Sequence, residues 1–333
     1  MPAPPSGPAT SAKIPSLRWT ARIRAVGVES PGNARDPGAK SSRVRVAAVQ
    51  MAAVEQREAN LEQAVAGIRS AAAQGAELVC LQELFATPYF CQVEEARRFD
   101  LAEPVDGPTN RAIAEAAREA RVCVLSSFFE RRAAGVYHNT AVLFGPDGGA
   151  LGMYRKMHIP DDPQYYEKFY FTPGDLGFVS IAAGRTRVGP LVCWDQWYPE
   201  AARLTALAGA ELLFYPTAIG WLPEDKPTHG ADQLNAWQTM QRSHAIANGV
   251  FVVVANRVGT ERAGEHSIQF WGHSFICDPY GHVIAEAGED PGVLVADCDL
   301  ALIEQARRGW PFLRDRRIDA YAGLALRFGT PAR

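Results

Sequence analysis

The 333-residue sequence lacks the features that mark several classes of protein. No apolar run approaches the ~18 residues that indicate a membrane-spanning helix. The formal net charge is −3, so the chain has no basic character of the kind that binds nucleic acid. We therefore expect no membrane and no nucleic acid as partners. The 47% of apolar and 21% of charged residues are typical of a soluble globular protein.

Metal-binding and disulfide patterns are also missing. The six cysteines include no CxxC pair, and Cys80, Cys123 and Cys193 lie in apolar, strand-like runs rather than in a disulfide framework. The seven histidines show neither HExxH nor HxH spacing. We expect no metal site, no cofactor, and a reducing compartment such as the cytoplasm.

Residues 1–43 differ in composition from the rest of the chain. They are rich in Pro, Ala, Ser and Arg, poor in acids, and lack the apolar core of ~7–15 residues that a secretory signal needs. An organellar transit peptide has a similar composition, but we expect a disordered leader or a misassigned start. The folded domain is expected at 44–325, followed by a tail at 326–333.

Strand-like and helix-like segments alternate along the rest of the sequence, which predicts a single-domain α/β fold. A twenty-residue stretch, 158–177, has no regular apolar period, and such long loops are usually functional or disordered. Its aromatic content argues against disorder. Two short segments, 75–79 and 209–213, have similar sequences, and each opens a strand after a helix. This similarity has two explanations, chance or an internal repeat. The expected strands are 43–50, 77–83, 122–129, 211–216 and 250–256; the helices 60–74, 109–121, 199–208 and 231–248; and the hairpins 138–157 and 269–299, before a helical tail at 300–333.

Three expected strands end in residues with reactive side chains: Glu83, Lys156 and Cys193. Most cysteines are small buried hydrophobic residues. Cys193, however, lies just before a helix start, where the helix dipole favours a thiolate. A carboxylate, an ammonium and a thiol at strand ends provide a base, an electrostatic clamp and a nucleophile.

In order and context these three residues resemble the Glu-Lys-Cys triad of the nitrilase, or carbon–nitrogen hydrolase, superfamily. The resemblance covers about residues 43–325 and points toward the N-carbamoylputrescine amidohydrolases. It implies an αββα sandwich with the triad at one rim, and a homodimer or larger homo-oligomer. Pro190 and Gly249 depart from the pattern. The supporting segments are 88–92, 154–163, 165–174, 193–197, 214–220 and 315–317.

The resemblance also implies a role for each residue. Cys193 would attack a carbamoyl carbon, and Glu83 would act as general base and acid. Lys156 and the backbone N–H of Trp194 would stabilise the oxyanion. Glu167, in the long loop, would orient Lys156 or the attacking water.

The substrate implied by the resemblance is a small carbamoyl amine that ends in an ammonium group. Aromatic side chains would stack around this group, although many of them are expected in the core. Asp161, Asp162 or Asp195 would supply the counter-charge. The expected substrate contacts are Tyr89, Tyr166, Trp194, His158 and Trp221, with Trp197 also considered.

Two alternatives remain open at this point. Carbamoyl amino acids, the substrates of β-ureidopropionases and D-carbamoylases, carry a carboxylate that needs an arginine fork. After Cys193 no arginine follows until Arg203, on an expected helix, which favours the amine. A catalytically inactive binding scaffold is the second alternative.

The hypothesis of a carbamoyl amine substrate places the protein in polyamine biosynthesis.

Overall fold

The structure, a computed structural model, describes residues 42–329. The leader expected at 1–43 lies outside this range except for its last two residues, and so does the end of the tail expected at 326–333. Over residues 42–329, no helix has the length and apolar character needed to cross a membrane.

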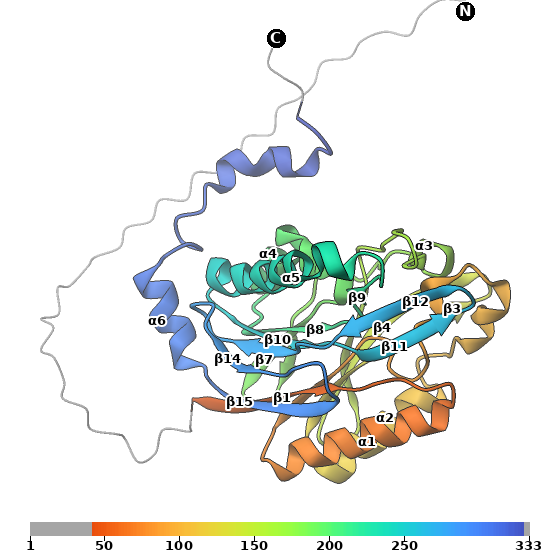
Figure 1. Ribbon diagram of the computed structural model, residues 1–333. Coiled ribbons are helices and arrows are strands. Elements are labelled where there is room, and N and C mark those ends of the chain that lie inside the picture. The colour runs from red at the N-terminus through yellow and green to blue at the C-terminus, as the bar shows by residue number, and fades with distance from the viewer. Residues whose placement is uncertain (1–41, 330–333) are drawn as a thin grey trace, which may run out of the picture. The chain divides into compact units, whose positions relative to one another are not determined.

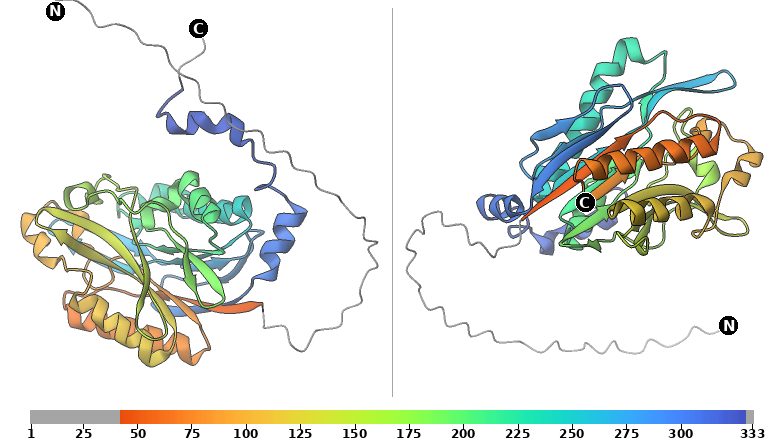
Figure 2. Two further views of the ribbon diagram at one scale, coloured as in Figure 1. Left: turned by 180° about the vertical axis from the view of Figure 1, so that it is seen from behind. Right: turned by 90° about the horizontal axis from the view of Figure 1, so that it is seen from below.

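Two six-stranded sheets stack face to face, and two helices cover the outer face of each (Figures 1 and 2). In spatial order the first sheet contains β15 (Gly292–Asp299), β1 (Arg43–Gln50), β2 (Leu78–Leu81), β3 (Cys123–Ala133), β4 (Val136–Phe144) and β5 (Ala150–Arg155). The second contains β14 (Val283–Glu286), β13 (Phe275–Cys277), β10 (Phe251–Ala255), β8 (Leu212–Pro216), β7 (Thr186–Pro190) and β6 (Ile181–Ala183). The covering helices are α1 (Arg57–Ala73) and α2 (Pro108–Ala120) on the first sheet, and α4 (Pro199–Leu207) and α5 (Lys226–Asn248) on the second. This αββα sandwich confirms the predicted fold.

Each sheet is built around a parallel βαβαβ unit, β1-α1-β2-α2-β3 in one and β7-α4-β8-α5-β10 in the other. Gly75 (φ 82°) and Gly209 (φ 100°) follow α1 and α4 in a conformation that glycine adopts at low cost. The backbone N–H groups of Glu77 and Glu211 then bond the first strand of their units. The two similar segments therefore occupy equivalent positions in the two units.

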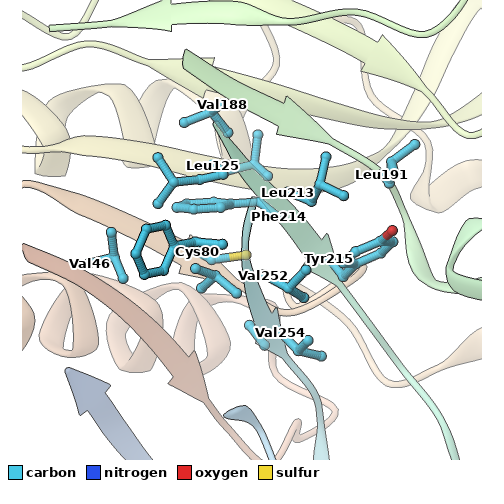
Figure 3. Packing of buried hydrophobic residues seen from close by; sticks show 14 of the residues in the cluster. Val46, Cys80, Leu125, Val188, Leu191, Leu213, Phe214, Tyr215, Val252 and Val254 are labelled. Atoms are coloured by element: carbon cyan, nitrogen blue, oxygen red, sulfur yellow. The ribbon is translucent and has the colours of Figure 1, made fainter. Parts of the chain in front are cut away.

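The larger hydrophobic core fills the space between the two sheets (Figure 3). Cys80 and Leu125 from the first sheet meet Leu213 and Val252 from the second, and all four are buried. All five residues of β10 are buried, because the facing sheet covers one side of the strand and helices cover the other. This explains why the central strands are continuous apolar runs.

A small antiparallel sheet, which the sequence did not predict, contains β11 (Val258–Ala263), β12 (His266–Trp271) and β9 (Gly220–Trp221). Figure 2 shows its β11–β12 hairpin extending beyond the large sheets. The other short elements are α3 (Glu167–Tyr170), α6 (Ala301–Gly309), η1 (Phe90–Gln92), η2 (Ala96–Leu101), η3 (Cys193–Trp197) and η4 (Ile318–Ala325).

The prediction of a single hairpin over 269–299 is wrong. Only β13 and β14 pair around the expected turn at 278–281, whereas β12 belongs to the small sheet and β15 pairs with β1. Alternation and turn residues indicate strands, but they do not specify which distant strand is the partner. Helix α5 begins at Lys226, before the expected residue 231, and α3 interrupts the loop expected at 158–177.

The two departures noted in the sequence have local explanations. Pro190 is the last residue of β7, and the next backbone N–H, of Leu191, bonds the carbonyl of Phe214 at 2.9 Å. Gly249 ends α5 with φ 57°, the left-handed conformation that favours glycine after a helix.

Candidate active site

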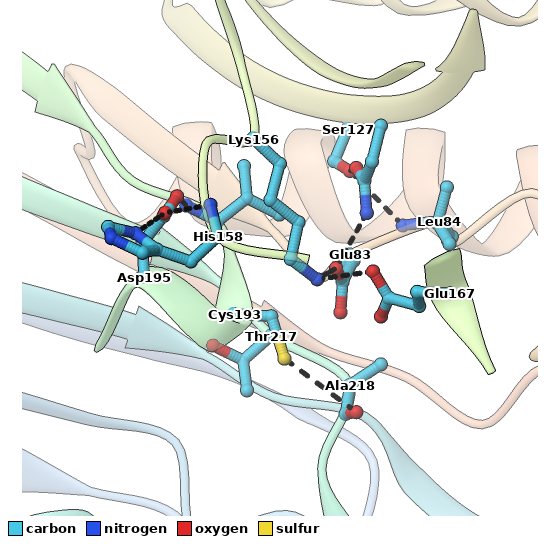
Figure 4. A network of polar contacts seen from close by, with 12 residues as sticks. Glu83, Leu84, Ser127, Lys156, His158, Glu167, Cys193, Asp195, Thr217 and Ala218 are labelled. Atoms are coloured by element: carbon cyan, nitrogen blue, oxygen red, sulfur yellow. Dashed lines mark hydrogen bonds and ion pairs between the residues drawn. The ribbon is translucent and has the colours of Figure 1, made fainter. Parts of the chain in front are cut away.

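Four of the residues singled out in the sequence meet at one edge of the sandwich (Figure 4). Glu83 follows β2, Lys156 follows β5, Glu167 begins α3, and Cys193 begins η3 shortly after β7. Strand β2 is parallel to β1 and β3, and β7 is parallel to β8; the carboxyl ends of parallel strands form the usual binding edge of α/β folds.

Lys156 joins two buried carboxylates. Its Nζ lies 2.8 Å from Oε1 of Glu83 and 2.6 Å from Oε2 of Glu167, and all three side chains are fully buried. The Nδ2 of Asn139 also donates to Oε1 of Glu83, at 2.7 Å. Within residues 42–329, the second oxygen of Glu83 is buried and has no partner, so it is free to accept a proton.

The charges in this cluster are strongly coupled. Burial, together with the charge of Glu83, raises the pKa of Glu167 to about 7, although Lys156 and the hydroxyl of Tyr89 lower it. Burial disfavours the charged form of Lys156, but the two carboxylates outweigh it and raise the lysine pKa well above its ordinary value. Lys156 therefore stays an ammonium, and Glu167 changes charge near neutral pH.

Cys193 lies at a strained turn. Its φ of 42° is in the left-handed region, where residues other than glycine are uncommon and often functional. Burial and the charge of Glu83 raise the pKa of the thiol well above its ordinary value, and Lys156 only partly offsets them. The expectation of a resting thiolate at a helix start is therefore wrong, because burial and the charge of Glu83 raise the thiol pKa more than Lys156 lowers it. A protonated thiol needs a base, and Figure 4 shows its sulfur on the side of the Glu83 carboxylate and the Lys156 ammonium.

Asp195 and His158 hold the turn that carries the nucleophile. One oxygen of Asp195 accepts hydrogen bonds from the hydroxyl of Tyr154 at 2.8 Å and the backbone N–H of Val192 at 2.9 Å. The other oxygen contacts His158 at its backbone N (3.1 Å) and at Nδ1 (2.8 Å). Because these contacts use both carboxylate oxygens, Asp195 anchors the protein rather than a substrate.

A cavity of about 420 Å³ opens at Cys193 and Glu167. Its wall combines aromatic and acidic residues and includes no lysine, arginine or histidine among the described residues. The indole N–H groups of two of these residues, Trp197 and Trp271, are buried without an acceptor in residues 42–329. The polar and aromatic lining residues are Asp162, Asp225, Gln233, Tyr165, Trp194, Trp197 and Trp271.

Of the five expected substrate contacts, Trp194 lines the cavity and the other four do not. Tyr89 is buried behind it and donates its hydroxyl to Oε1 of Glu167 at 2.7 Å. Trp221 is buried and donates from Nε1 to the carbonyl of Gly230 at 3.0 Å. Tyr166 is partly buried beside α3, and His158 is bound to Asp195 as described above.

Several residues at the cavity carried no signal in the sequence. Trp271 ends β12, a strand assigned to the wrong hairpin, and Asp225 precedes a helix that was expected to start later. Tyr165 opens one of the segments that support the resemblance but was not singled out as a contact, and its hydroxyl accepts from the N–H of Gly220 at 3.0 Å. Of the three aspartates considered as counter-charges, Asp162 lines the cavity and Asp161 does not.

Neither a metal cluster nor a disulfide is found in the described part of the chain. No group of three or more His, Cys, Asp or Glu residues in this part is arranged to hold a metal ion. All six cysteines are free and buried. The arrangement of thiol, free carboxylate oxygen and fixed ammonium is suited to nucleophilic attack on a carbonyl carbon.

Comparisons with known proteins place this geometry in a family. Residues 45–308 match the carbon–nitrogen hydrolase family. The chain is 44% identical over 293 residues to an N-carbamoylputrescine amidase from Oryza sativa subsp. japonica, covering 86% of this chain and 96% of the relative. It is 38% identical to a citrullinase from Francisella tularensis, covering 86% and 99%.

A solved structure agrees with the sequence match. The crystal structure of a carbon–nitrogen hydrolase from Helicobacter pylori G27 is 46% identical, covers 86% of this chain and all of its own, and superposes with a TM-score of 0.84. The chain therefore belongs to the carbon–nitrogen hydrolase family of the nitrilase superfamily and is an enzyme of that hydrolase family.

Proposed function

We propose that this enzyme is a cysteine-dependent amidohydrolase that converts N-carbamoylputrescine and water to putrescine, carbon dioxide and ammonia. The observation that carries the proposal is the unpartnered oxygen of Glu83, held beside Lys156 and Cys193 at a cavity without cationic lining residues. The 44% identity to the rice N-carbamoylputrescine amidase supports it. The putrescine formed would enter polyamine biosynthesis.

In the first half-reaction, Cys193 attacks the carbamoyl carbon. The free oxygen of Glu83 takes the thiol proton as the C–S bond forms, because the buried thiol has a raised pKa. Lys156 and the backbone N–H of Trp194 stabilise the tetrahedral oxyanion. N–H groups in the first turn of a helix have no acceptor within the helix, and Trp194 is the second residue of η3. Glu83 then protonates the leaving nitrogen, and ammonia departs as the C–N bond breaks.

In the second half-reaction, water releases the product from the thiocarbamate. Glu83 takes a proton from the water, whose oxygen attacks the carbonyl carbon. The C–S bond breaks, the thiol regains its proton, and a carbamic acid is released. The carbamic acid then decomposes to the amine and carbon dioxide. Glu167 orients Lys156 throughout, through their 2.6 Å ion pair.

The cavity chemistry supports a substrate with a cationic end. Asp162 and Asp225 face it, and neither forms an ion pair in the described part of the chain. Trp194 and Trp197 offer aromatic faces to an ammonium group. Citrulline also carries an ammonium group, but its carboxylate would meet a wall without lysine or arginine. The diamine derivative is therefore favoured over citrulline and other carbamoyl amino acids.

Ammonia release from four compounds tests the proposal: N-carbamoylputrescine, citrulline, N-carbamoyl-β-alanine and an N-carbamoyl-D-amino acid. We expect kcat/KM to be highest for N-carbamoylputrescine, with Cys193→Ala as the inactive control. A higher kcat/KM for any carboxylate-bearing compound would overturn the substrate assignment. Alkylation of Cys193 without turnover of any compound would support the inactive scaffold.

An assembly is also part of the proposal. Large apolar side chains in the C-terminal segment are exposed, including Trp310 at 50%, Leu324 at 67% and Phe328 at 89%. Apolar surface of this extent usually marks an interface. We expect a homodimer or larger homo-oligomer in light scattering, and dissociation when Leu324 and Phe328 are replaced by serine.

A further inference from the structure

The turn that presents Glu83 is short and strained. It runs from Glu83 to Tyr89, whose hydroxyl holds Glu167, so both active-site carboxylates depend on it. Leu84, directly after Glu83, has φ 48°. A leucine in this left-handed conformation persists only where the surrounding structure fixes it. What fixes the turn therefore bears on the reaction.

One buried arginine from a distant part of the chain binds the backbone of this turn. Arg257, between β10 and β11, is fully buried. Its Nη2 donates to the carbonyl oxygens of Glu83 at 3.0 Å and Leu84 at 2.9 Å. Its Nη1 donates to the carbonyl of Thr87 at 3.0 Å and to Oε1 of Glu261 at 2.7 Å.

Glu261 completes the contact at the other end of the turn. Its second oxygen, Oε2, accepts the backbone N–H of Tyr89 at 2.5 Å. The Arg257–Glu261 pair thus binds the turn at four backbone positions, from Glu83 to Tyr89. Neither member of the pair lines the cavity.

The small sheet that carries this pair also forms part of the cavity wall. Glu261 lies in β11, which pairs with β12, and β12 pairs with β9. Trp271 at the end of β12 and Gly220 in β9 both line the cavity. The wall that receives the substrate and the residues that hold the base are therefore one hydrogen-bonded unit.

We propose that Arg257 and Glu261 are positioning residues for the hydrolysis. They hold the carboxylate of Glu83 at the distance from Cys193 that proton transfer needs, and they hold Tyr89 against Glu167. The inference rests on the proposed function for the role of Glu83 as base. It goes beyond that function by assigning the placement of the base to a salt bridge outside the cavity.

The chemistry of the pair predicts which substitutions fail. Glu261→Gln keeps the shape but offers one carbonyl oxygen where two donors, Arg257 and the Tyr89 N–H, need acceptors. Glu261→Asp keeps both oxygens on a shorter side chain. Arg257→Lys replaces a planar fork by a point charge that cannot reach three carbonyls and a carboxylate together.

The test compares kcat, KM and the rate of Cys193 alkylation by iodoacetamide in these variants. Misplacing a catalytic group by about 1 Å costs about 10²-fold. We expect Glu261→Gln and Arg257→Lys to lower kcat and the alkylation rate about 10- to 100-fold, toward the values of Glu83→Gln. KM should change less than about 3-fold, and Glu261→Asp should retain more activity than Glu261→Gln. Asp278→Asn, which alters a similarly buried carboxylate that accepts two backbone N–H groups in the β13–β14 turn, is the matched control.

The outcomes separate the two proposals. Folded Glu261→Gln protein with wild-type kcat and alkylation rate would overturn the positioning role, and so would an equal loss in Asp278→Asn. If Arg257→Lys does not fold, the comparison of activity between Glu261→Asp and Glu261→Gln decides whether the positioning role holds. A wild-type enzyme inactive on N-carbamoylputrescine would refute the substrate assignment, whereas the alkylation rates would still test the positioning role.

Discussion

Glu167→Gln tests the buried charge cluster directly, because the two side chains have nearly the same shape and differ mainly in charge. Glu167 is fully buried, and its burial next to Glu83 raises its pKa to about 7 from an ordinary value of 4.5. Glutamine cannot ionise. The difference between the two proteins therefore reports the ionisation of Glu167 together with its effect on the neighbouring charges of Lys156 and Glu83.

The magnitude follows from proton linkage. Between pH 4.5 and about 7 the folded protein keeps a proton on Glu167 that the unfolded chain has released. Protonation then favours the folded state, so this contribution is complete below pH 4.5 and is lost as the pH rises through 7. At about 1.4 kcal/mol for each pH unit, the contribution to the free energy of unfolding is about 3 kcal/mol.

Urea unfolding of both proteins, from about pH 4 to pH 8, measures this contribution. We expect the free energy of unfolding of the wild type to fall by about 3 kcal/mol relative to Glu167→Gln across the window. Parallel pH curves, or a variant that loses stability relative to the wild type as the pH rises, would refute the reasoning.

Three further variants test the assigned roles. Cys193→Ala should abolish ammonia release with an unchanged melting temperature, and residual turnover above ~1% would contradict a covalent route. Lys156→Arg should lower kcat by ~10²–10³-fold in steady-state kinetics, because a planar guanidinium does not fit between two buried carboxylates; near-normal kcat would exclude the lysine as oxyanion clamp. The double change Asp162→Asn with Asp225→Asn should raise KM for N-carbamoylputrescine about 10-fold and leave KM for uncharged butylurea unchanged. An equal increase for both compounds would argue against an ammonium site.

The fold and three of the four reactive residues follow from local sequence signals. Apolar runs that end in Glu83 and Cys193, with helices between them, indicate parallel strands whose ends share an edge. Lys156 ends an expected strand in the same way, and the resemblance to the nitrilase superfamily then singled out Glu167. The structure brings all four into one cluster, with Lys156 between the two carboxylates.

The partners that hold this cluster could not be predicted in the same way. Arg257 and Glu83 are 174 residues apart, and their contact depends on the packing of two sheets. His158 was expected to contact the substrate and Asp195 was considered as a counter-charge, but they use their polar groups on each other. Composition shows that such groups exist, whereas only the three-dimensional arrangement shows which acceptors are already occupied.

The pairing of β1 with β15 has a consequence for how the chain acquires its structure on the ribosome. The two strands share eight register pairs, from Arg43 with Asp299 to Gln50 with Gly292. The first strand of the described range therefore gains this partner only when the last strand of that range has been synthesised, and a high contact order of this kind slows folding. Until β15 arrives, β1 presents an open edge to other nascent chains. Truncation before Gly292 should therefore yield aggregates, even though every residue of the proposed catalytic cluster would already have been synthesised.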